Sequence, residues 1–197
     1  MRHLHTIPGT KTLLVMAVLA GGLSACKSKK KVADATPQPD GEVEVVIPCS
    51  GKEYFTDDKH FRANSLGESM DQATAKRKAL SQARADLAAA INTQVSAVID
   101  NYVNSREMNN REEVAERYES LAREVVDQKL NGTRTICEKM MKVTATNNYK
   151  AYVAIELSAQ DLLAAYNERL SNDERLRIDY DYEKFKETFE REMNKLR

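Results

Sequence analysis

Few residues in this chain have side chains suited to covalent or metal chemistry. The sequence contains three cysteines, Cys26, Cys49 and Cys137, and three histidines, of which only His60 lies beyond the first few residues. A cysteine beside a histidine can act as a thiolate nucleophile, and two cysteines with a histidine supply part of a zinc site. No local signature accompanies either pairing, and a zinc site would need both thiols and a carboxylate to converge on His60. We therefore expect no catalytic residues, no metal, no cofactor and no enzyme activity.

Cys26 follows a segment with the layout of an export signal. Arg2 and Lys11 are its only charged residues, residues 13–23 form a short apolar run, and Leu23-Ser24-Ala25-Cys26 closes it. The run is too short to span a bilayer comfortably. The arrangement resembles the bacterial lipoprotein signal, which is cut before its cysteine. We expect residues 1–25 to be removed and Cys26 to carry lipid, including palmitate. A soluble secreted protein and an uncleaved anchor helix are the alternatives.

Residues 26–42 have the composition of a flexible, basic tether. Lys27, Lys29, Lys30 and Lys31 would lie near the membrane and add roughly 1 kcal/mol each against anionic head groups. By the same resemblance, Lys27 in place of aspartate predicts transfer to the outer membrane, with the domain facing the periplasm. Loss of the signal leaves 28 basic and 30 acidic residues, so nucleic acid is not an expected partner.

Cys49 and Cys137 form an even pair in a potentially oxidising compartment. Both lie on the apolar faces of expected strands. They form either a disulfide that ties the first strand to the central hairpin or two buried free thiols, and spacing alone does not decide between these.

The order of the expected elements predicts a helix packed on a small sheet. Alternation over residues 43–49 predicts a strand, and residues 50–67 a polar connection. A capping box at Ser69 then precedes a long Ala-rich helix, whose apolar stripe runs from Leu80 to Tyr102. A second helix is expected over residues 112–127.

Two β-rich runs, residues 133–146 and 150–157, predict a hairpin around Asn147-Asn148. The odd positions are the more apolar ones in both runs. Only a loop with an odd number of residues would place them on one face, so we predict a loop of three or five residues.

Two helices are expected after the hairpin. Ser158 to Asp161 is a capping signature for the first, and the last begins after Ser171-Asn172-Asp173. This last helix has a narrow apolar stripe set in dense charge. The stripe is a candidate partner-binding surface, or it packs on its own domain, and it comprises Ile178, Tyr182, Phe185, Phe189, Met193 and Leu196.

The pattern as a whole predicts an α+β fold. A long Ala-rich helix packs on a small antiparallel sheet of about three strands, with additional C-terminal helices. The expected divisions are a signal peptide (1–25), a lipidated tether (26–42), a compact α+β domain (43–160) and a C-terminal helical extension (161–197).

Three features together resemble the twenty-kilodalton membrane-associated lipoprotein family. They are the lipoprotein signal that ends at Cys26, the helix motif Ala73-x5-Ala79-x3-Ala83-x3-Leu87 and the hairpin end Tyr152-Val153-Ala154-Ile155. A related module occurs in a flagellar envelope protein. The likeness covers residues 43–160. It implies a lipid-anchored envelope protein with a helix across a small sheet, and it carries over no catalytic residue.

Two functions follow as expectations. The first is a non-catalytic interaction or structural module, bound to the membrane through Cys26 and to an envelope protein or a second copy of itself. The alternative is a carrier of a small apolar or glycan-derived ligand, held in a cleft between the long helix and the sheet.

Overall fold

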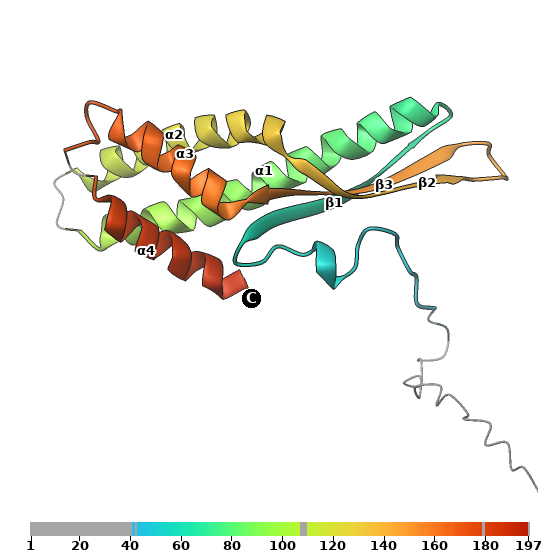
Figure 1. Cartoon of the computed structure of the whole chain (residues 1–197), viewed down its shortest axis with the longest axis horizontal. Helices are drawn as coiled ribbons and strands as arrows, with labels where there is room; N and C mark the ends of the chain where they lie inside the picture. Colours follow the sequence, from blue (N-terminus) through green and yellow to red (C-terminus); the bar gives the residue numbers. More distant parts are fainter. Residues whose placement is uncertain (1–40, 42, 107–109, 179, 197) are drawn as a thin grey trace, which may run out of the picture. The chain divides into compact units, whose positions relative to one another are not determined.

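The computed structural model describes residues 41, 43–106, 110–178 and 180–196 (Figure 1). The chain divides into two units, Met1–Glu44 and Val45–Arg197. All the helices and strands of the described residues lie in the second unit, and the α+β class is confirmed. They are β1 (His60–Ser69), α1 (Gln72–Asn104), α2 (Arg111–Lys129), β2 (Arg134–Lys142), β3 (Tyr149–Ser158), α3 (Ala159–Ser171), α4 (Tyr182–Met193) and the single turns Lys52–Tyr54, Leu130–Gly132 and Asn194–Leu196.

The three strands form one antiparallel sheet in the order β1-β3-β2. Phe61 pairs with Leu157, and Met140 pairs with Ala151. A register shift between Thr135 and Cys137 interrupts β2. Side chains on one face of the sheet pack against α1, and we call the opposite face the outer face.

The N-terminal half of α1 lies directly on the sheet (Figure 1). Ala75, Ala79 and Ala83 are completely buried there. A Cβ atom at Gly67 of β1 would lie 2.2 Å from the Ala75 carbonyl oxygen and 2.5 Å from the Ala79 amide nitrogen. Small residues on both elements therefore let the helix and the strand approach closely, and no cleft separates them at this point.

The C-terminal half of α1 packs against helices instead. It contacts α2 and α4, and α2 also contacts α3 (Figure 1). The core here is aromatic: Tyr102 and Phe185 meet edge to face with ring centroids 5.3 Å apart. The buried Tyr166 hydroxyl donates to the Ala122 carbonyl oxygen at 3.2 Å. The C-terminal helices share one hydrophobic core with the sheet, so the boundary expected after residue 160 does not separate two cores.

The expected strand over residues 43–49 is wrong, and the first strand lies in the expected connection. Residues 43–47 belong to no strand, and Cys49 has a φ of 59° in a turn. The inward positions of β1 after Phe61 are Ala63, Ser65 and Gly67. Because α1 approaches so closely, these positions are small or polar, and the strand lacks the apolar alternation that would reveal it.

The predicted hairpin is present, but its loop has an even number of residues and not the predicted three or five. Lys142 pairs with Tyr149, which leaves six residues in the connection. The apolar odd positions of the two strands therefore lie on different faces: Val153 and Ile155 are buried under α1, whereas Cys137 and Met141 are on the outer face. The prediction failed because it assumed that only one face of β2 could carry apolar residues.

The helix starts match the expectations in part. The Ser158 side chain accepts from the Asp161 amide at 3.2 Å, which confirms that cap. Asp71, two residues after the expected Ser69, caps α1 by accepting from the Thr74 amide at 2.7 Å. The last helix begins at Tyr182, later than expected, with Asp181 as its cap. Within the described ranges, no helix has both the length and the apolarity needed to cross a membrane.

We predict that Gly67→Ala destabilises the domain by about 1–3 kcal/mol, because its Cβ must displace the backbone of α1. Urea unfolding followed by circular dichroism measures this free energy. Gly132→Ala is the matched control, since no atom lies within 4 Å of its added Cβ. Equal stabilities of the two variants would contradict the close contact between α1 and β1.

Candidate functional site

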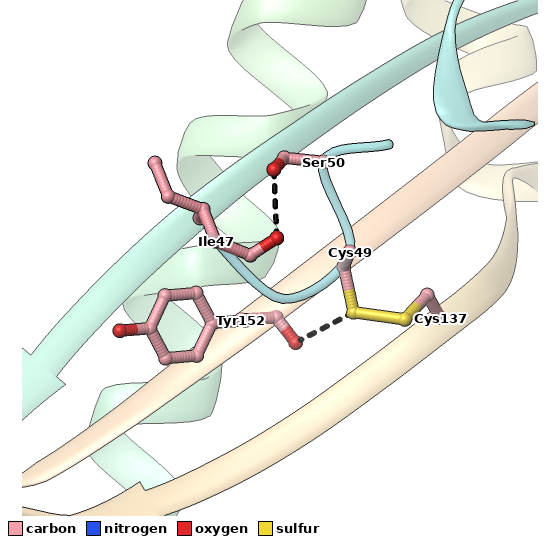
Figure 2. The surroundings of a disulfide bond; sticks show 5 residues. All are labelled: Ile47, Cys49, Ser50, Cys137 and Tyr152. Carbon is pink, nitrogen blue, oxygen red and sulfur yellow. Dashed lines mark hydrogen bonds between the residues drawn. A yellow bond between two sulfur atoms is a disulfide. The ribbon is translucent and has the colours of Figure 1, made fainter. Parts of the chain in front are cut away.

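A disulfide fastens the N-terminal segment to the outer face of the sheet. Cys49 and Cys137 are bonded, with their Cα atoms 5.6 Å apart and a sequence separation of 88 (Figure 2). Cys49 is buried, and its sulfur lies 3.7 Å from the Tyr152 carbonyl oxygen. The Ser50 hydroxyl donates to the Ile47 carbonyl oxygen at 2.8 Å and closes the turn. Of the two alternatives for this pair, the structure contains the disulfide, although its first cysteine lies in a turn and not in a strand.

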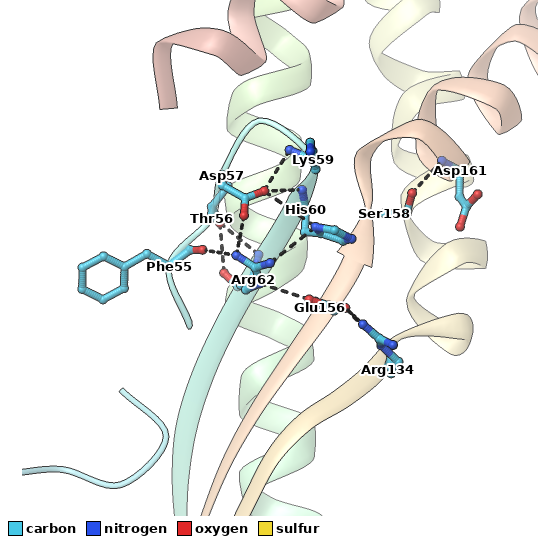
Figure 3. A network of polar contacts seen from close by, with 10 residues as sticks. All are labelled: Phe55, Thr56, Asp57, Lys59, His60, Arg62, Arg134, Glu156, Ser158 and Asp161. Atoms are coloured by element: carbon cyan, nitrogen blue, oxygen red, sulfur yellow. Dashed lines mark hydrogen bonds and ion pairs between the residues drawn. The ribbon is translucent and has the colours of Figure 1, made fainter. Parts of the chain in front are cut away.

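A second polar cluster lies on the same outer face, at the start of β1 (Figure 3). Its centre is Glu156 of β3, which is only 6% exposed. Arg62 Nε donates to Glu156 Oε2 at 3.0 Å, and Arg134 Nε donates to Glu156 Oε1 at 3.0 Å. One carboxylate thus joins both edge strands to the central strand.

Arg62 extends this network into the preceding loop. Its Nη1 donates to Asp57 Oδ2 at 2.7 Å and to the Phe55 carbonyl oxygen at 2.8 Å. Asp57 Oδ1 in turn accepts from the Lys59 and His60 amides, both at 2.8 Å. The loop before β1 is therefore held in one conformation by side-chain hydrogen bonds to its backbone.

The two carboxyl groups of this network are more acidic than usual. Burial opposes ionisation of Glu156, but hydrogen bonds from Arg134 and Arg62 hold its pKa below the ordinary value of 4.5. Burial also opposes ionisation of Asp57, and hydrogen bonds from the Lys59 amide and Arg62 outweigh it, so the pKa lies below 3.8. Both groups are therefore carboxylates at neutral pH, and their role here is to hold the fold.

The residues considered for covalent chemistry are engaged elsewhere. Both thiols are consumed in the disulfide, so neither can pair with His60 as a nucleophile or ligate zinc in this oxidised form. His60 Nδ1 lies 3.4 Å from Arg62 Nη2 and 3.7 Å from Asp57 Oδ1. Across the described ranges, no group of three or more His, Cys, Asp or Glu residues could hold a metal ion. Cys26 lies outside the described residues.

The apolar stripe considered for partner binding is largely internal. Phe185, Phe189 and Met193 are buried against the other helices, and Leu196 and Tyr182 are partly buried. Ile178 is 81% exposed, but it precedes α4 and does not continue the stripe. In this fold the stripe packs on its own domain, and it does not offer a continuous surface to a partner helix.

A groove on the helical side of the molecule is bordered by charged residues. It lies between α2 and α3, has a volume of about 550 Å³, and is bordered by Glu124, Lys129, Glu168 and Arg169. Arg169 Nη2 donates to Glu124 Oε2 across it at 2.7 Å. A groove bridged by an ion pair does not have the apolar lining typical of a pocket for an apolar ligand.

Sequence reasoning did not identify the Arg62–Glu156–Arg134 network. Its members are up to 94 residues apart, so no local spacing connects them. One available signal was Glu156 itself, the only carboxylate in the otherwise apolar run Ala151–Leu157. A charged residue in a buried strand requires partners of opposite charge.

Comparisons with known proteins do not assign this chain to a family. No family model matches this chain, and no match was found among curated proteins or solved structures. The function must therefore be argued from the chain itself.

We predict that removing the disulfide by Cys49→Ala with Cys137→Ala lowers the free energy of unfolding by about 2–5 kcal/mol, because a closed loop of this length restricts the unfolded chain. Denaturant unfolding with and without a reducing agent measures the change. Reduction should destabilise the native protein and leave the double variant unaffected. A native protein insensitive to reduction would contradict this prediction.

We predict that Glu156→Gln lowers stability at neutral pH by about 1–3 kcal/mol, because two arginines lose a charged acceptor. The folded pKa is depressed, so this stabilisation is complete above pH 4.5 and is lost as the pH falls through the folded value. The native protein should therefore lose stability more steeply than the variant in acid.

Unfolding free energies measured from pH 6 to pH 3 test this difference. Asp57 contributes the same sign of dependence, so part of the slope remains in the variant. Glu190→Gln, at an exposed position of α4, controls for the lost charge and should keep the native slope. Parallel curves for the native protein and Glu156→Gln would contradict the assignment.

Proposed function

We propose that this protein is a lipid-anchored lipoprotein of the cell envelope, which acts as a non-catalytic interaction or structural module facing the periplasm. The anchor is lipid on Cys26 in the outer membrane. The observation that carries the proposal is the disulfide between Cys49 and Cys137. Disulfides persist in oxidising compartments, so the bond agrees with the export signal that precedes it.

The position of the disulfide suits an anchored protein. Residues 27–48 separate the proposed lipid from Cys49 and would reach at most roughly 70–80 Å when extended. A tether of this length leaves the domain free to contact proteins near the membrane. The disulfide would transmit a mechanical force on the tether directly to β2. The hydrogen bonds of the turn would then bear little of this force.

The arrangement of polar residues supports a binding role over a catalytic one. The two thiols are bonded to each other, and the buried carboxylate Glu156 is neutralised by two arginines. A general acid or base works best with a pKa near the operating pH, whereas the pKa of Glu156 is depressed. The exposed surfaces of the domain, including a sheet edge, are therefore the candidates for binding a partner.

We predict that Cys26→Ser abolishes lipid attachment and releases the protein from the membrane, because the thiol is the acceptor. Labelling cells with radioactive palmitate and separating membranes on a density gradient measures both effects. The Cys49→Ala, Cys137→Ala double variant is the matched control and should remain labelled. Palmitate on Cys26→Ser, or a native protein found only in soluble fractions, would contradict the proposed anchor.

Cross-linking in intact cells tests the interaction role. The native protein should be captured in a reproducible complex with an envelope protein or with a second copy of itself. A native protein that is membrane-bound but always recovered alone would contradict that role.

A further inference from the structure

The segment Val43–Ile47 has the composition of a strand but pairs with nothing in the described part of the chain. Val43, Val45 and Ile47 alternate with Glu44 and Val46. Val45 is 75% exposed, Val46 87% and Ile47 52%. β-Branched residues favour extended pairing, and an exposed cluster of this kind is unusual unless something covers it.

Within the described residues, the sheet also has one edge that no other segment covers. β1 and β2 are the two edges, and that of β1 is partly closed. The Thr56 hydroxyl bonds both the amide and the carbonyl of Arg62, at 2.9 and 3.1 Å, and Lys78 Nζ donates to the Glu68 carbonyl oxygen at 3.1 Å. Within the described ranges, no side chain forms a hydrogen bond of this kind with the outward backbone groups of β2, which has nine residues.

The alternation of hydrogen bonds shows which backbone groups of β2 are available. The Val143 amide donates to the Asn148 carbonyl oxygen at 2.8 Å, so odd positions of this strand bond to β3. The amides and carbonyls of the even positions Glu138, Met140 and Lys142 therefore point away from the sheet. They form the backbone pattern that an added strand requires.

We infer that Val43–Ile47 of one molecule adds as a fourth strand to the free edge of β2 in a second copy of this chain. The inference rests on the proposed interaction role and names its partner. In the antiparallel register that pairs Glu44 with Lys142, Val45 lies opposite Met141 and Val46 opposite Met140. Met141 is 47% exposed in the single molecule and gains an apolar neighbour in this arrangement.

The local geometry favours exchange over pairing with the segment's own β2. Cys49, with its φ of 59°, lies in the turn that follows Ile47, and in Figure 2 Ile47 projects on the side of β3 away from β2. Two copies can exchange segments reciprocally about a two-fold axis, which yields two added strands per dimer. Attachment to one membrane would also raise the effective concentration of the two copies.

Charge reversal tests this pairing directly. Full-length chains with two different C-terminal tags are co-expressed, one tag is captured from detergent-solubilised membranes, and the other is quantified. Glu44→Lys or Lys142→Glu, present in both copies, should lower co-capture by at least about threefold, because like charges then face each other. One copy with Glu44→Lys and one with Lys142→Glu should recover native co-capture, since both interfaces regain opposite charges.

Two controls keep the result specific. Lys139→Glu paired with Glu44→Lys should show no recovery, because Lys142 remains opposite the reversed charge. Val46→Pro should abolish co-capture and Val46→Thr should preserve it, since this exposed position contributes nothing to the folded domain. Native co-capture by Val46→Pro, or the absence of recovery in the mixed pair, would overturn the inference.

The outcomes also separate this inference from the proposed function. Native copies that never co-purify, while cross-linking recovers a different envelope protein, would overturn strand exchange and leave the interaction role standing. A native protein that incorporates no palmitate would instead contradict the proposed lipid anchor, whatever the co-capture result.

Discussion

The close contact between α1 and β1 is the constraint on which the rest of this structure depends. Helix α1 has 33 residues and is about 50 Å long, whereas ten-residue strands span about 33 Å. Once Ala75 and Ala79 lie against Gly67, one end of the helix is fixed on the sheet and the other must extend past it. The apolar residues of that second half, such as Val98 and Tyr102, then need helices to cover them. The packing of α2 and α4 on α1, and of α3 on α2, follows from this need.

The same constraint explains which elements the sequence could reveal. Helix α1 was predictable because its apolar stripe continues from Leu80 to Tyr102 without Gly or Pro, and β3 because Val153, Ile155 and Leu157 alternate. β1 was missed because the helix leaves room only for Ala63, Ser65 and Gly67 on its inward side. In contrast, residues 43–49 were assigned to a strand on composition, which reports a preference for extended backbone but does not report a partner.

The candidate site was less predictable than the fold, since it is built from distant residues. The disulfide was one of two open alternatives because sequence carries no distances between thiols. Arg62 and Glu156 meet only because β1 lies beside β3, a pairing that requires the true position of β1. Together the disulfide and this network hold both ends of the segment from Cys49 to Arg62 against the outer face. In the proposed anchored state, this segment is where the tether joins the domain.

The charge distribution along β2 bears on how such an edge can be both exposed and selective. Lysine on an edge strand discourages pairing with unrelated strands, because the charge would be buried beside another backbone. Lys139 and Lys142 serve this purpose on β2, where both are exposed. A donor strand that carries a carboxylate at the matching position turns the same charge into an attraction. In the inferred pairing, Glu44 supplies that carboxylate beside four β-branched residues. The lysine charge that protects the edge from general aggregation would then also select the acidic segment of the chain's own N-terminal region.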